Sequence, residues 1–208
     1  MRAKSTKFFA VIFIASVVSC FFSCGNKSSE FTPQTFVAFV ENKDNGFFKE
    51  KQMGNLLYKI KYEPVAYQAA RKVINGEIKD RNQWNSFMKE RGGLNYFVIE
   101  IENARSESDV LMEEVQGNEM YLQRVNYFSY DFERDISFVP GNDTLPCALF
   151  HYENSYGGTP KLKFLVAFQN KEGDKGRTVV INDRVFNNGN IKFEMNETQE
   201  EENLVLNF

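Results

Sequence analysis

Alternation of apolar and polar side chains with a period of two is the feature that most restricts the fold of this chain. In residues 55–62, Tyr58, Ile60 and Tyr62 share one face, and lysines occupy the other. Because successive side chains of a strand point to opposite faces of a sheet, such a segment is half buried. The same pattern recurs at 162–168, 191–195 and 204–208. Repeated amphipathic strands predict antiparallel sheets with one face in the core.

Further strands follow from composition and turn residues. The segments 94–101 and 145–152 are apolar on both faces, so we expect them to be central strands. Shorter strands are expected at 35–40, 136–139 and 179–185. Asn187-Asn188-Gly189 then marks a hairpin turn, since Asn and Gly tolerate a positive φ.

Helical segments are few. Residues 64–74 begin with Pro and stop before Gly76; a second helix, capped by Asp80 or Asn82, runs through Arg91 and stops at Gly92-Gly93. Ser106-Glu107-Ser108-Asp109 resembles a capping box that would open a helix through Val115. Segment 121–130 is ambiguous. We therefore predict a mainly β fold, with α+β as the alternative: an antiparallel β-sandwich or strongly bent sheet with two or three short helices.

The N-terminus has the pattern of an exported precursor. Three basic residues in positions 1–7 precede the apolar run 8–18. This run is shorter than the roughly 20 residues that a membrane span requires. We interpret residues 1–23 as a signal peptide, with a retained anchor helix as the alternative.

Two cysteines at the end of this run are candidates for lipid attachment. A small residue precedes each of Cys20 and Cys24, as in a bacterial lipobox. The polar residues that follow Cys24 favour it as the lipidated cysteine, and Cys20 is the alternative; a plain secretory signal is a third interpretation. Two or three acyl chains on one cysteine anchor a protein stably, whereas one chain binds only marginally. Residues 24–34 then form a polar tether, and 35–208 a single β-rich domain.

The charge of the chain argues against nucleic acid as a partner. Removal of the signal peptide with its three basic residues leaves 22 basic against 28 acidic residues, a net charge of about −6. A basic face is what nucleic acids and anionic membranes require.

No arrangement of residues predicts catalysis, a metal or a cofactor. The single histidine, His151, lies in an apolar strand with Glu153 nearby, and we expect it to be partly buried and structural. Cys147 also lies in an apolar run and is expected to be a buried, unreactive thiol. There is no phosphate-binding loop, dinucleotide fingerprint or zinc-ligand spacing. We predict a non-enzymatic protein with no catalytic residues.

Paired carboxylates are the groups that glycosidases use. Glu100 and Glu102 share one strand face, and acids at positions 131, 133 and 135 form a second cluster. Acids spaced by two on a strand belong more simply to its solvated face.

Aromatic residues supply the one hypothesis for a ligand surface. Tyr127, Tyr130 and Tyr156 lie in polar, turn-like segments and could present rings to a glycan or a partner. Phe128 and Tyr152 are their neighbours. Packing in the core is the competing interpretation, because a chain with 21 Phe must bury most of its rings.

The lipobox, the polar tether and the domain rich in Phe, Tyr, Asn and Lys resemble uncharacterised lipoproteins of Bacteroidota. Stretches such as YKIKYEPVAYQA and DISFVPGNDTLPCALFHYE carry the likeness in the domain. The resemblance implies an outer-membrane lipoprotein and brings no catalytic residues. Some such lipoproteins reach the cell surface by means of an acidic stretch directly after the cysteine. Residues 25–29 contain no acid, so we expect the domain to face the periplasm.

Two functions follow as hypotheses. The first is an accessory subunit of an envelope assembly, such as a secretion apparatus, with a protein partner. The second is a lipoprotein that binds a glycan or small ligand through aromatic loops.

Overall fold

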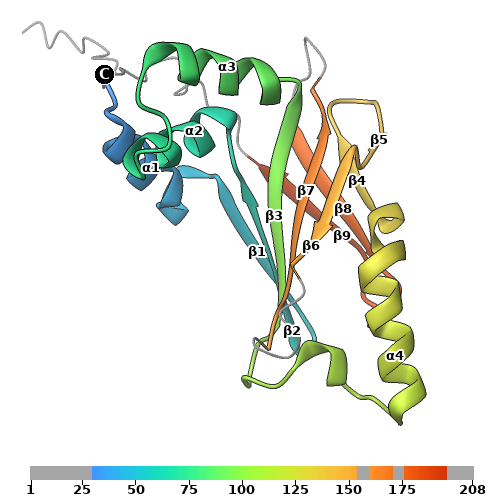
Figure 1. Ribbon diagram of the computed structural model, residues 1–208. Helices are drawn as coiled ribbons and strands as arrows, with labels where there is room; N and C mark the ends of the chain where they lie inside the picture. Colours follow the sequence, from blue (N-terminus) through green and yellow to red (C-terminus); the bar gives the residue numbers. More distant parts are fainter. Residues whose placement is uncertain (1–29, 154–159, 171–175, 196–208) are drawn as a thin grey trace, which may run out of the picture.

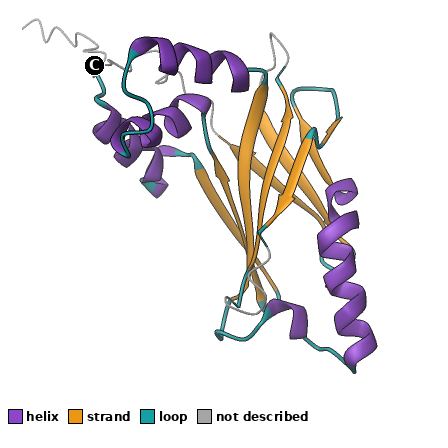
Figure 2. Ribbon diagram, viewed as in Figure 1, coloured by secondary structure: helices purple, strands orange, loops and turns teal. Residues whose placement is uncertain are grey.

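The computed structural model describes residues 30–153, 160–170 and 176–195. Within these ranges the chain forms two antiparallel sheets with nine strands in all, together with four α-helices (Figure 2). The prediction of a mainly β, antiparallel fold with α+β character is therefore confirmed.

The larger sheet has five strands in the order β1-β2-β3-β7-β6. These are β1 (Phe48–Met53), β2 (Leu56–Tyr62), β3 (Leu94–Asn103), β7 (Leu162–Gln169) and β6 (Leu149–Tyr152). The long strand β3 is central, as its apolar character predicted. Each neighbouring pair is antiparallel.

The smaller sheet has four strands in the order β5-β4-β8-β9. These are β5 (Leu145–Pro146), β4 (Ile136–Val139), β8 (Arg177–Asp183) and β9 (Gly189–Met195). Strands β8 and β9 form the expected hairpin, and Asn187 and Gly189 in its turn have positive φ values of 59° and 67°.

The core lies between the two sheets and is rich in aromatic rings. Alternate residues of β2 are buried, and Tyr58 and Ile60 are fully enclosed. Phe97 on β3 lies 5.7 Å from Phe138 on β4, so the contact joins the two sheets. Burial of such side chains contributes about 1.5–3 kcal/mol each, which makes this interface the main source of stability.

The helices occupy two separate regions. Helices α1 (Pro33–Glu41), α2 (Val65–Ile74) and α3 (Arg81–Arg91) gather at one end of the larger sheet, whereas α4 (Asn118–Asn126) lies beside the other end (Figure 1). Val65 of α2 packs on Tyr96 and Ala167, which lie on the outer face of that sheet. Among the described residues, no helix combines the length and apolar character needed to cross a bilayer.

The expected strand at 35–40 is wrong, because these residues belong to α1. Thr32 and Thr35 form a reciprocal capping box, and Pro33 occupies the first turn. Phe36 and Val40, one helical turn apart, are both buried. The cap and this spacing outweigh the strand propensity of the aromatic and β-branched residues. The helix begins within the segment that composition indicated as tether.

The expected helix at 106–115 is also wrong. The hydroxyls of Ser106 and Ser108 bond to each other at 2.6 Å, and Asp109 caps only the short 3-10 helix Val110–Met112. Local side-chain hydrogen bonds of this kind compete with helix formation. The helix starts later, at Asn118, and continues into a π-helical turn over Tyr127–Asp131.

The segment 145–152 is not one central strand. Strand β5 pairs with β4 in the smaller sheet, and β6 pairs with β7 at the edge of the larger sheet. The chain therefore crosses between the sheets at Cys147 and Ala148. The strand predicted at 204–208 lies outside the described residues.

Candidate functional site

A pocket of about 400 Å³ lies at the end of the sandwich remote from α1–α3. Its walls come from the β1–β2 turn (Met53 to Leu56), the segment 113–116, the first turns of α4 and the β8–β9 loop (Val185 to Asn188). Small-molecule sites usually measure about 300–1,000 Å³. The pocket therefore suits a small ligand, and four separate parts of the chain build it.

Arg124 is the main charged group in the wall of this pocket. Its side chain extends from α4 and is only 9 % exposed. Its Nη1 donates to the carbonyl oxygens of Leu111, at 3.1 Å, and Glu113. The guanidinium lies 4.9 Å from the centre of the Phe186 ring. Backbone and ring contacts thus fix its position.

No carboxylate of the described residues lies within ion-pair distance of Arg124. Burial lowers the pKa of Arg124, and the charges of Glu113, Glu114 and Asp183 partly offset that effect. A guanidinium nevertheless stays protonated in proteins. A buried cation without a paired anion is costly to the fold, and two backbone carbonyls and the Phe186 ring are the contacts that hold it here.

Backbone strain is concentrated at the same place. Among the described residues, Glu114 and Asn187 are the two non-glycine residues with positive φ, at 53° and 59°. Both line the pocket. Asn tolerates this conformation, but Glu adopts it rarely. Strain of this kind persists where the surroundings hold it in place, and it clusters at functional sites.

A buried hydrogen-bond network supports the β8–β9 loop beneath the pocket. The Tyr58 hydroxyl donates to Asp183 at 2.7 Å, and the Asn188 amide donates to the same carboxylate at 2.8 Å. The backbone NH of Phe186 also donates to Asp183, at 3.0 Å. Burial and the bond to Asp183 raise the pKa of Tyr58 far above its usual value. The phenol is therefore neutral and holds the loop in shape.

A second buried network surrounds Tyr127. Its hydroxyl donates to Asp135 at 2.8 Å, and Asn182 donates to the other carboxylate oxygen at 3.1 Å. Arg184 forms an ion pair with Asp135. Burial, with the hydrogen bond to Asp135, raises the pKa of Tyr127. Tyr127 is thus half-buried and structural, so it does not serve as the exposed ring that the sequence suggested.

The other aromatic residues have different positions. Tyr130 is 73 % exposed, as a surface ring would be. Phe128 is buried, and Tyr152 stacks on Phe164 with centroids 5.0 Å apart. Tyr156 lies outside the described residues. Of the predicted aromatics that the structure describes, Tyr130 is exposed while Tyr127 and Phe128 are half-buried and buried, and none of these three lines the pocket.

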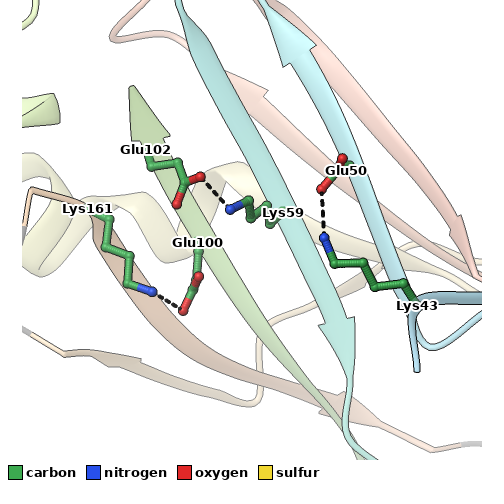
Figure 3. Close-up of polar contacts among 6 residues, drawn as sticks. All are labelled: Lys43, Glu50, Lys59, Glu100, Glu102 and Lys161. Atoms are coloured by element: carbon green, nitrogen blue, oxygen red, sulfur yellow. Dashed lines mark hydrogen bonds and ion pairs between the residues drawn. The ribbon is translucent and has the colours of Figure 1, made fainter. Parts of the chain in front are cut away.

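The paired acids Glu100 and Glu102 lie on the outer face of the larger sheet (Figure 3). Glu100 pairs with Lys161 at 2.8 Å, and Glu102 pairs with Lys59. Lys43 and Glu50 add a third pair at 3.7 Å. Each carboxylate is matched to a lysine, so the interpretation as a solvated strand face is the one that the contacts support. A hollow of about 410 Å³ beside Lys161 contains groups already engaged in these pairs.

His151 and Cys147 complete the residues that the sequence singled out. His151 is exposed on the edge strand β6, so the expectation of a partly buried histidine is wrong. Its side chain points to the outer face because the neighbouring Phe150 and Tyr152 point inward. Cys147 is partly buried, and burial raises the pKa of its thiol to about 12. An elevated thiol pKa agrees with an unreactive side chain.

Sequence reasoning missed Arg124, because the signal that marks it is not local. An arginine on an ambiguous helix looks like an ordinary surface residue until the fold buries it. Cys20 and Cys24 lie outside the described residues, so lipid attachment stays a prediction.

Comparison with known proteins gives little further guidance. No protein family model matches the chain, and no curated protein matches it. One solved structure, a novel protein of unknown function from Burkholderia pseudomallei K96243, is similar over 85 % of this chain and 94 % of its own. The identity is 9 % and the TM-score is 0.35, so this likeness carries no argument about function.

Proposed function

We propose that the protein is a lipid-anchored, non-enzymatic binding protein of the bacterial envelope that holds a small ligand in the pocket at Arg124. The observation that carries this proposal is the buried Arg124, which lines the pocket without a paired carboxylate. The strained backbone of Glu114 in the same wall supports it. Lipid attachment at Cys24, or at Cys20, and a periplasm-facing position at the outer membrane are part of the proposal.

Blocking the pocket tests this function. Met120 lines the pocket on α4 and is 36 % exposed, so Met120→Trp fills the space with little cost to the core. Leu122→Trp is the matched control, because Leu122 is 51 % exposed on the same helix and does not line the pocket. The purified protein is incubated with a small-molecule extract of the cells and examined by native mass spectrometry. We expect a bound species that Met120→Trp loses and Leu122→Trp keeps. Equal adducts on both variants, or none on the parent, would contradict the proposal.

As a second function, we propose that the protein is an accessory subunit of an envelope assembly. It is favoured by large apolar side chains exposed along α4 and the turn that follows it, Leu122 and Tyr130. Exposed apolar side chains in one region are typical of protein contact surfaces. Crosslinking in cells, followed by mass spectrometry, tests this function: a stoichiometric partner lost in Leu122→Glu supports it. Recovery of the monomer alone would remove it.

A further inference from the structure

The charges around the pocket are of both signs. Arg124 contributes a cation that two backbone carbonyls hold in place. Glu113 and Glu114 contribute two carboxylates. Glu113 already accepts hydrogen bonds from Asn55, at 3.0 Å, and Asn103, at 2.8 Å. Glu114 is exposed and has no hydrogen bond or ion pair with another described side chain. One cation and one carboxylate in this wall therefore remain available to a ligand.

The guanidinium has donors left for an oxyanion. Its Nη1 is fully used by the two backbone carbonyls. An arginine has five N–H donors in a planar fork, so donors of the remaining nitrogens are left to bind a carboxylate. The Phe186 ring against the guanidinium limits its movement. An oxyanion bound here would complete the ion pair that the fold leaves unmade.

The rest of the wall selects against a purely anionic ligand. Two carboxylates near a single guanidinium repel a group with several negative charges, such as phosphate. A ligand that also carries a cation turns this repulsion into attraction at Glu114. Met53 and Met120 add apolar, adaptable surface to the same pocket.

We infer that the ligand is a small zwitterion, a free amino acid or the end of a short peptide, whose carboxylate binds Arg124 and whose ammonium binds Glu114. Its side chain lies against the methionines. This inference rests on the proposed binding function and names the chemical class of the ligand. A volume of about 400 Å³ accommodates an amino acid or a dipeptide.

Titration calorimetry with a defined panel tests the inference. The panel contains the twenty common amino acids and dipeptides of them, together with N-acetylated and C-amidated derivatives, acetate and inorganic phosphate. We expect at least one zwitterion to bind, and either modification of it to weaken binding at least tenfold. Charge-assisted hydrogen bonds are strong enough to produce such an effect.

Variants locate each charge. Glu114→Gln should weaken binding of the zwitterion about three- to tenfold and leave the weaker binding of its N-acetyl derivative unchanged, since that derivative has no ammonium. Glu119→Gln is the control, because Glu119 is exposed on α4 and does not line the pocket. Arg124→Gln should abolish measurable binding, and its thermal unfolding curve reports whether it folds. Glu114→Gln keeps the test decisive if Arg124→Gln does not fold, because residue 114 is exposed.

Several outcomes would overturn the inference. They are binding of no zwitterion in the panel, equal affinity for the N-acetyl derivative, and an unchanged affinity in Glu114→Gln. Another outcome is that a neutral or purely anionic compound binds the parent protein and that Met120→Trp loses this binding. The inference of a zwitterionic ligand would then be wrong, but the pocket would still be the binding site. The two failures are therefore distinguishable.

Discussion

At the scale of single residues, two buried polar side chains of the described chain, Arg124 and Asp183, hold the walls of the pocket. Arg124 and Asp183 are each more than nine-tenths buried; Arg124 donates to two carbonyl oxygens of the segment 111–113, and Asp183 accepts from Tyr58, Phe186 and Asn188. Buried polar groups are tolerated when they are satisfied, and costly when one partner is removed. The polar network therefore fixes the loop geometry while the apolar core supplies the stability.

Tyr58→Phe tests the role of the polar network separately from that of the apolar core. The change removes one of three hydrogen bonds to the buried Asp183 and keeps the ring in the core. We expect the free energy of unfolding to fall by about 1–3 kcal/mol, measured by urea denaturation. Tyr130→Phe is the control, since Tyr130 is exposed and a change within about 0.5 kcal/mol is expected there. An equal effect of both changes would show that the network does not matter.

The same residue predicts an effect of alkaline pH. Because burial and Asp183 raise the pKa of Tyr58, the folded state favours the neutral phenol. The unfolded phenol titrates near pH 10, so this contribution is complete below about pH 10 and is lost as the pH rises further. We expect the stability of the parent to fall from about pH 9.5 to 11 more steeply than that of Tyr58→Phe. Parallel pH profiles would mean that Tyr58 titrates normally.

At the scale of elements, the outer face of the larger sheet carries an alternating row of charges. The strand register places Glu50 opposite Lys59, Lys59 opposite Glu100 and Glu100 opposite Lys163. Glu102 and Lys161 lie beside this row and pair with it. Opposite charges on facing strands contribute roughly 0.2–1 kcal/mol per pair. The row thus also helps to specify the register of four strands.

Lys59→Glu should disturb this row more than a single lost contact would. It places a new carboxylate among Glu50, Glu100 and Glu102 on a partly buried surface. We expect a loss of about 1–2 kcal/mol in the free energy of unfolding, reduced in 1 M salt, where the screening length is about 3 Å. Lys192→Glu is the control, because Lys192 is exposed on β9 and faces Val180 on the neighbouring strand instead of a charged residue. A loss that does not respond to salt would point to packing as its cause.

Elements with a strong period were predictable from the sequence, and those decided by caps or crossings were not. Strand β2 and helix α2 follow their patterns because the buried face of each is continuous. The Phe and Val residues of helix α1 favour a strand prediction, and only the capping pair Thr32 and Thr35 identifies the segment as a helix. The candidate site could not be predicted from the sequence for another reason. The fold brings Arg124, Glu114 and Asn187 together, and these residues share no local motif.

At the scale of the whole molecule, the first described helix and the pocket lie at opposite ends. Helix α1, the first element of the described chain, lies with α2 and α3 at one end, and the β1–β2 turn lies at the other (Figure 1). Strand β1 runs from the end beside α1 to the pocket residue Met53. Residues 24–31 would span at most roughly 30 Å if extended. A lipid on Cys24 would thus hold the helical end near the membrane and leave the pocket open to the aqueous side.

The anchor itself can be tested by replacing each cysteine in turn. We expect Cys24→Ser to move the protein from the detergent phase to the aqueous phase in a Triton X-114 partition. Cys20→Ser should leave the parent distribution unchanged, and the intact mass of the N-terminal peptide should show acyl chains on Cys24. The reverse result would assign the lipid to Cys20, which adds four residues to the tether and still leaves the pocket remote from the membrane. If both single variants and the double variant partition as the parent does, the lipid anchor is wrong, and the orientation of the pocket loses its basis as well.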